Sequence, residues 1–173
     1  GGQNAIWHGG QGHGWMTHFH MIPETGDAIV ILTNSQRSWP LIAELLLDWS
    51  EWIGIGLVKF SRIVYATKAG WLVTGLVAGW AVLIFSQLGT NLMNGKSKFE
   101  PFSRHKLAPR LAKFSSGFVL FGLVILRTLQ PYVFESSIFP GLIRWFAASV
   151  LVLSSAMLIS SLFIDVQTCP LDN

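Results

Sequence analysis

The chain contains 173 residues, of which 51% are hydrophobic and only 12% are charged, and its formal net charge at pH 7 is +3. Soluble domains carry about 25% charged residues, so this composition excludes an ordinary soluble protein and is typical of a membrane protein. The positive charge is concentrated in one loop, residues 89–113, which argues against a nucleic-acid-binding surface. We therefore expect a lipid bilayer as a partner and no nucleic acid.

Histidines and acidic residues gather near the N-terminus, whereas long apolar runs begin at Ala69. Residues 1–54 hold four of the five histidines, and five acidic residues against one basic residue. This division predicts a water-facing part over residues 1–54, a juxtamembrane connector over residues 55–68 and a membrane domain over residues 69–173. The sequence starts on a Gly-Gly pair, without a signal peptide, so we expect the C-terminal part of a longer protein.

Three strands and one helix are predicted in the water-facing part. Residues 4–8, 15–22 and 28–33 read as strands, and a Pro-Glu-Thr-Gly-Asp turn precedes the last of them. The alternation along residues 15–22 divides its side chains between two faces, with Trp15, Thr17, Phe19 and Met21 on one and Met16, His18, His20 and Ile22 on the other. We expect His18 and His20 to be surface histidines. Residues 28–33 have no polar face, so we expect a central strand there.

A helix beginning at Ser38-Trp39-Pro40 and ending at Gly54 is predicted to cover the sheet, with proline in the first turn. Glu44, Asp48 and Glu51 would form an acidic stripe on its outer face. The predicted fold class is therefore an α+β piece, antiparallel strands plus a closing helix, followed by an all-α membrane domain of three transmembrane helices.

The membrane domain contains three apolar segments long enough to cross a bilayer. They lie at about residues 69–88, 114–134 and 145–164, and twenty helical residues cover about 30 Å. Loop 89–113 holds six Lys or Arg residues and is therefore predicted to be cytoplasmic. The N-terminal part would then lie outside the cytoplasm and the C-terminus inside.

These segments are expected to anchor the protein rather than to transport a solute, because the first and third hold no acidic residue, histidine or paired charge. Arg127, near the end of the second, would reach the headgroups. Small side chains in the first segment indicate helix–helix association there; they are Gly70, Gly75, Gly79 and Ser86.

A glycine-rich stretch, Trp7–Trp15, carries the functional hypothesis. It holds four glycines and two histidines, and the 23–27 turn and the apolar 28–34 segment follow it. His8-Gly9-Gly10-Gln11, followed by Gly14-Trp15 and this hairpin, resembles the end of the serine β-lactamase and penicillin-binding-protein-like hydrolase domain. The resemblance is closest to the class C β-lactamase-related group, and it covers about residues 1–53.

The resemblance implies an acyl-serine mechanism without a cofactor, acting on a small-molecule or peptide substrate. His8 would take the place of the family's motif lysine as a proton-transfer or hydrogen-bonding group. The backbone N–H of Gln11 would be one donor of the oxyanion hole. Gly9, Gly10 and Gly12 would let the substrate lie close to the strand. Histidine in place of lysine favours peptidase or esterase activity over β-lactamase activity.

The family's nucleophile motif Ser-x-x-Lys and its Tyr-x-Asn motif would lie upstream. Ser103-Arg104-His105-Lys106 matches the first as a string, but it follows the third motif and falls in the predicted cytoplasmic loop, so we reject it. These residues alone should therefore be inactive. The alternative is a non-catalytic membrane protein with a degenerate β-lactamase-like binding or sensing domain.

Two other readings compete for the histidines. His8, His13, His18 and His20 could bind a metal, although no acidic residue or cysteine accompanies them, so no metal site is predicted. His8 could also be a hydrogen-bonded structural histidine. The glycine cluster lacks the Gly-Lys-Ser/Thr of a phosphate loop. The single cysteine, Cys169, cannot form an intramolecular disulfide and is expected to be inert.

Overall fold

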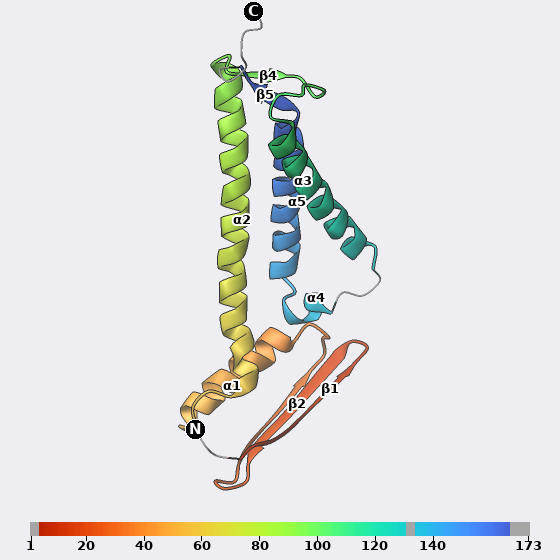
Figure 1. Ribbon diagram of the computed structural model, residues 1–173. Helices are drawn as coiled ribbons and strands as arrows, with labels where there is room; N and C mark the ends of the chain where they lie inside the picture. Colours follow the sequence, from red (N-terminus) through yellow and green to blue (C-terminus); the bar gives the residue numbers. More distant parts are fainter. Residues whose placement is uncertain (1–3, 131–133, 167–173) are drawn as a thin grey trace, which may run out of the picture. The chain divides into compact units, whose positions relative to one another are not determined.

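The computed structural model describes residues 4–130 and 134–166, and it is an α+β structure in which helices predominate (Figure 1). Contacts divide the chain into two units, Gly1–Trp71 with Val133–Arg144, and Leu72–Tyr132 with Trp145–Asn173. Cys169 and the rest of the C-terminal tail beyond residue 166 lie outside the described residues, as does the Gly-Gly start.

The first unit contains a three-stranded antiparallel sheet. Its strands β1 (Ile6–Gly12), β2 (Trp15–Ile22) and β3 (Asp27–Thr33) pair in the order β1-β2-β3. Gly14 and Gly26 supply the positive φ, +83° and +80°, that the two hairpin turns require. The predicted hairpin between the second and third strands is therefore confirmed.

The predicted division of β2 into two faces is confirmed. Met16, His18, His20 and Ile22 are buried, while the alternate residues are at least partly exposed. The expectation that His18 and His20 are surface residues was wrong, since they are only 3% and 4% exposed. They are buried because the helix and the segment that follows it cover this face of the sheet.

The predicted central position of residues 28–33 was also wrong for the described residues, where β3 is an edge strand. Ile31 is buried against the helix, but Val30 and Leu32 on the other face are 63% and 74% exposed. An unbroken run of apolar residues therefore does not by itself show that a strand is central in its sheet. In β3 this run leaves apolar side chains exposed on the outer face.

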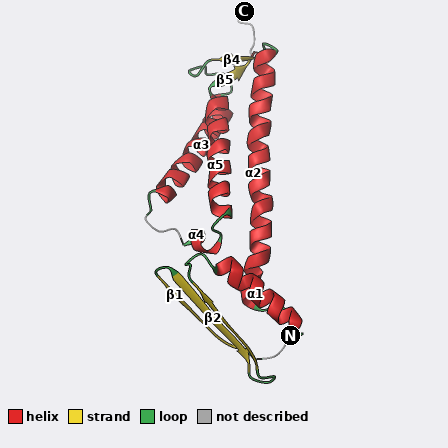
Figure 2. Ribbon diagram, turned by 180° about the vertical axis from the view of Figure 1, so that it is seen from behind, coloured by secondary structure: helices red, strands yellow, loops and turns green. Residues whose placement is uncertain are grey.

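Helix α1 (Trp39–Trp52) lies alongside the sheet, as Figures 1 and 2 show from opposite sides, and it packs its apolar face against the sheet. The core consists of residues from β2, β3 and α1, namely Met16, Ile22, Ile31, Ile42, Leu46 and Trp49. The acidic residues Glu44, Asp48 and Glu51 lie on the exposed side, as expected from their spacing.

The chain turns back along the sheet after α1. Gly54 and Gly56 adopt positive φ, and the N–H of Ile55 donates to the carbonyl of Ser50. A short 3₁₀ turn η1 (Lys59–Ser61) then leads directly into α2 (Arg62–Met93). Residues 55–60 therefore form a wall opposite the sheet rather than an extended linker.

Among the described residues, three helices are long and apolar enough to cross a membrane. They are Lys59–Met93, which joins η1 and α2, α3 (Leu107–Thr128) and α5 (Leu142–Ser161). The expected 69–88 segment lies within the first. Helix α3 begins earlier than expected and ends at Thr128, ahead of the expected end at residue 134; residues 131–133 of that segment lie outside the described residues. A proline at position 131 disfavours continuation of the helix.

The expected third segment, 145–164, overlaps α5, and the chain leaves the helix at Ser161 to form β5 (Phe163–Asp165). This strand pairs with β4 (Ser97–Phe99) of the basic loop. Arg110 closes the same region, because its guanidinium donates to the carbonyls of Glu100, Ser103 and Ser161 at 2.8, 2.8 and 2.9 Å. A further short helix, α4 (Glu135–Ile138), precedes α5.

Glycines mark two places where helices approach neighbouring side chains. A Cβ at Gly117 of α3 would lie 3.1 Å from the Cβ of Met157 on α5, and a Cβ at Gly70 would overlap Leu142. By contrast, a Cβ at Gly75 or Gly79 would meet nothing within 4 Å. Two of the four small residues expected to mediate helix association therefore face open space among the described residues.

Candidate functional site

The glycine-rich stretch forms β1 and the turn after it, and β1 is an edge strand of the described sheet. His8 pairs with Phe19 and Gln11 pairs with Met16. Residues directly opposite each other share a face, so His8 lies on the outer face with Phe19, away from α1. Its side chain is exposed and accessible from solvent.

The backbone of Gln11 is oriented by the hydrogen bonds of the central strand. Thr33 Oγ1 on β3 donates to the carbonyl of Met16 at 3.1 Å, so this carbonyl points toward β3. In an antiparallel sheet, the N–H and C=O of a residue in a central strand both point toward the same neighbouring strand. Such a residue does not exchange hydrogen bonds with the strand on its other side. The N–H of Gln11, opposite Met16, therefore points away from β2, toward the outer edge of β1.

Two of the three predicted substrate-binding glycines have a packing explanation. A Cβ at Gly10 would lie 2.8 Å from Thr17 Oγ1 and 3.3 Å from the Trp15 indole, and a Cβ at Gly12 would overlap that indole. Trp15 thus lies across β1 and requires small residues there. Gly9 differs, since its nearest neighbour would be the Thr17 carbonyl at an ordinary 3.6 Å.

The four histidines of the N-terminal part are not brought together. His8 lies on the outer face, His13 lies in the exposed turn between β1 and β2, and His18 and His20 lie on the buried face. No group of three or more His, Cys, Asp or Glu side chains suited to a metal occurs among the described residues. The four-histidine metal site considered from the sequence is therefore not assembled.

Ser103 lies in an irregular segment. The segment Ser103–Lys106 precedes α3, and Lys106 has a left-handed backbone with φ of 47°. A serine and a lysine three residues apart share one side only when both lie in a helical turn. The local backbone therefore does not hold this Ser-x-x-Lys string in the arrangement that would let the lysine activate the serine.

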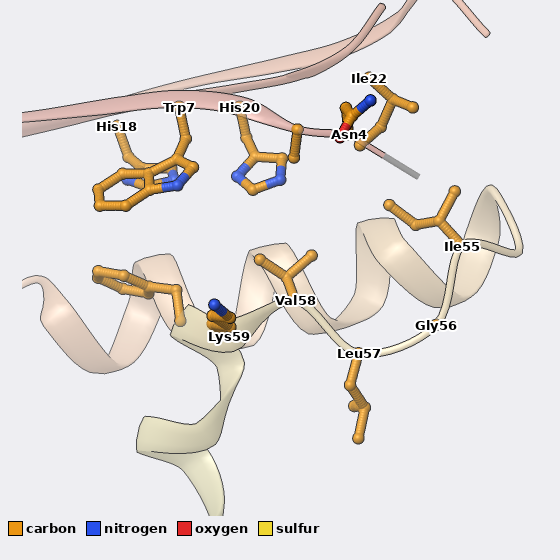
Figure 3. Close-up of a pocket in the computed structure, with 12 residues that line it drawn as sticks. Asn4, Trp7, His18, His20, Ile22, Ile55, Gly56, Leu57, Val58 and Lys59 are labelled. Atoms are coloured by element: carbon orange, nitrogen blue, oxygen red, sulfur yellow. The ribbon is translucent and has the colours of Figure 1, made fainter. Parts of the chain in front are cut away.

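Sequence reasoning missed a pocket of about 520 Å³ on the buried face of the sheet. Figure 3 shows Trp7, His18 and His20 descending from the strands on one side, with Val58 and Lys59 of the segment after α1 opposite them. The remaining lining is mostly apolar and includes Ile22, Ile55 and Phe60. The alternation along β2 already placed both histidines on the face of Met16 and Ile22, and that signal could have predicted their burial.

Aromatic rings surround the two histidines of this pocket. The His18 ring lies 5.8 Å from His20, 6.4 Å from Trp7 and 5.0 Å from Phe60, measured between ring centroids. The edge of Trp49 meets His20 at 5.6 Å. Burial lowers the pKa of both imidazoles below the ordinary 6.5, and the neighbouring His20 lowers the pKa of His18 further. Both are therefore neutral near pH 7.

One nitrogen of each ring lacks a hydrogen-bond partner among the described residues: Nε2 of His18 and Nδ1 of His20. Buried ring nitrogens are normally hydrogen-bonded, because an unsatisfied buried donor or acceptor costs about 1–3 kcal/mol. These two atoms are therefore polar positions in an otherwise apolar cavity.

No family model, curated protein or solved structure matches the chain. Two candidate sites are thus defined by geometry alone, on opposite faces of one small sheet. The outer one is the edge of β1 with His8 and the N–H of Gln11, and the inner one is the pocket around His18 and His20.

Proposed function

We propose that residues 1–54 are the C-terminal end of a serine hydrolase domain of the β-lactamase-related type, attached to a three-helix membrane anchor. The observation that carries the proposal is the edge strand β1, where the exposed imidazole of His8 and the backbone of Gln11 lie three residues apart. An acyl-transfer site needs both a proton-transfer group and a preorganised N–H donor near the developing oxyanion.

Gln11 and His8 have separate roles in this mechanism. The N–H of Gln11 donates a hydrogen bond to the oxyanion, and His8 exchanges a proton with the leaving group or binds a substrate carboxylate. A small-molecule or peptide substrate lies along β1, where Gly9 has no side chain that would obstruct it. Peptidase or esterase activity is favoured over β-lactamase activity because an imidazole holds a carboxylate less firmly than a lysine ammonium does.

The nucleophile comes from outside these 173 residues in this proposal. The protein as it occurs in its native membranes should be labelled by a fluorophosphonate probe, whereas the isolated 173-residue chain should not. His8→Ala in the native protein should lower turnover at least 100-fold, as expected when a proton-transfer group is lost, and His13→Ala in the exposed turn is the matched control. Labelling at Ser103, or His8→Ala turnover within a few-fold of the unsubstituted protein, would overturn the proposal.

One observation favours a second candidate, a non-catalytic membrane protein with a degenerate binding or sensing domain. Gly10 and Gly12 are already explained by the Trp15 indole, so no substrate is needed to account for them. An absence of fluorophosphonate labelling in native membranes would favour this candidate.

The membrane arrangement is part of the proposal. Loop 89–113 and the C-terminus face the cytoplasm, and the sheet lies outside it, because six Lys or Arg residues lie in that loop. Association of a second copy through α2 would use Gly75 and Gly79, where a helix backbone could approach closely. Leucine at both positions should then abolish cross-linked dimers in membranes.

A further inference from the structure

We propose that the pocket between β2 and residues 55–60 binds a single-chain lipid amphiphile with an uncharged, hydroxyl-bearing head, held by His18 and His20. This site is separate from the proposed catalytic His8, because the pocket lies on the buried face of the sheet and the His8 side chain lies on the outer face. It rests on the proposed membrane attachment but not on hydrolase activity.

The cavity has the size and lining of a small-molecule site. Its volume of about 520 Å³ lies within the range of about 300–1,000 Å³ that is usual for ligand pockets. The walls are apolar or aromatic apart from a few polar groups, which is the arrangement that buries a hydrocarbon chain and orients one head group. Lys59 is the only charged side chain of the lining, and it is exposed to solvent.

The two imidazoles determine the head group. Each neutral ring offers one N–H donor and one lone pair, and each has one buried nitrogen without a partner among the residues that the structure describes. A hydroxyl group both donates and accepts hydrogen bonds. It can therefore accept from a ring whose unpartnered nitrogen carries a proton and donate to a ring whose unpartnered nitrogen carries a lone pair. An anionic head would have to pair with the solvent-exposed ammonium of Lys59 rather than with the histidines, because the lowered pKa of both imidazoles disfavours the imidazolium form.

The position of the pocket in the chain favours a ligand taken from the bilayer. Residues 55–60 form one wall and run through η1 directly into α2. The uncharged run of α2 begins at Ala69, seven residues after Arg62, or about 10 Å of helix. The segment that carries Val58 and Phe60 therefore lies close to the membrane surface, where a lipid chain is available.

The test uses the 173-residue chain in lipid nanodiscs with a photoreactive C12 alcohol as the probe. We expect saturable labelling confined to residues 4–22 and 55–60, competed by dodecan-1-ol, and at least 10-fold weaker for dodecanoate at pH 7.5. His18→Leu with His20→Leu should reduce labelling at least 10-fold. His8→Leu with His13→Leu removes two histidines outside the pocket and should leave labelling unchanged.

A second variant and a second measurement address misfolding of the double variant. Val58→Trp fills the cavity from the connector side, where Figure 3 shows the Val58 side chain directed toward the sheet, and should also reduce labelling. In the unsubstituted protein, dodecan-1-ol should shift the ring ¹⁵N resonances of His18 and His20, whereas dodecane should not. Unsaturable labelling, equal labelling of the double variant, or unchanged ring resonances (the result if water alone fills the pocket) would overturn the proposal. None of these outcomes depends on fluorophosphonate reactivity.

Discussion

The indole of Trp15 lies directly over Gly12, its register partner across the first hairpin. The space that a Cβ would need at Gly12 is occupied by the indole's Nε1 and neighbouring ring carbons. Because the Trp15 indole occupies the space beside Gly10 and Gly12, this one side chain requires glycine at these positions of β1.

Gly12→Ala should therefore destabilise the sheet by about 1–3 kcal/mol, the usual cost of forcing extra atoms into a packed contact. Gly9→Ala is the control, because its Cβ would meet no atom closer than 3.6 Å. Thermal unfolding of both variants, each with and without Trp15→Ala, measures the coupling. An equal loss of stability in Gly9→Ala and Gly12→Ala would contradict the packing explanation.

The stability of the first unit should depend on pH through His18 and His20. Their pKa values are lowered in the folded state, so the unfolded chain binds more protons below its own histidine pKa of about 6.5. The free energy of unfolding should be constant just above that pH and should fall as the pH drops from about 6.5 toward the folded values. Urea unfolding monitored by hydrogen exchange in β2 should show this slope, and His18→Leu with His20→Leu should flatten it. A slope that survives in the double variant would assign the effect to other groups.

Arg110→Lys should loosen the basic loop although the charge is kept. The guanidinium reaches the carbonyls of four separate residues, and an ammonium group cannot reproduce that planar fork. Each lost hydrogen bond to a charged group is worth about 1.5–3 kcal/mol, so amides of residues 97–106 should exchange with solvent at least 10-fold faster. Arg104→Lys, at an exposed position of the same loop, is the matched control. Unchanged exchange in Arg110→Lys would show that the carbonyl contacts do not hold the loop.

The single cysteine provides a direct test of orientation. Cys169 should resist a membrane-impermeant maleimide in intact cells and react after permeabilisation, because the C-terminus is proposed to face the cytoplasm. Ser35→Cys in a Cys169→Ser background, at the exposed end of the hairpin, should show the opposite pattern. Labelling of Cys169 from outside would reverse the proposed topology.

Local patterns predicted the hairpin, the faces of β2 and the three long apolar helices, because each depends on residues close together in sequence. The burial of His18 and His20 was mispredicted because histidine was treated as polar, although its position matched that of Met16 and Ile22. The pocket could not be predicted. It forms only because Gly54 and Gly56 turn residues 55–60 back along the sheet, and no periodicity encodes that path.

The pairing of β4 with β5 has a consequence for insertion into a bilayer. The N–H of Val166 donates to the carbonyl of Lys96 at 2.9 Å, and the N–H of Glu100 donates to the carbonyl of Leu162 at 3.2 Å. Strands joined in this way must stand on one side of a membrane, so the chain between them crosses an even number of times. Helices α3 and α5 must then insert as a pair or not at all. A chain in which only one of them had crossed the membrane could not pair β4 with β5.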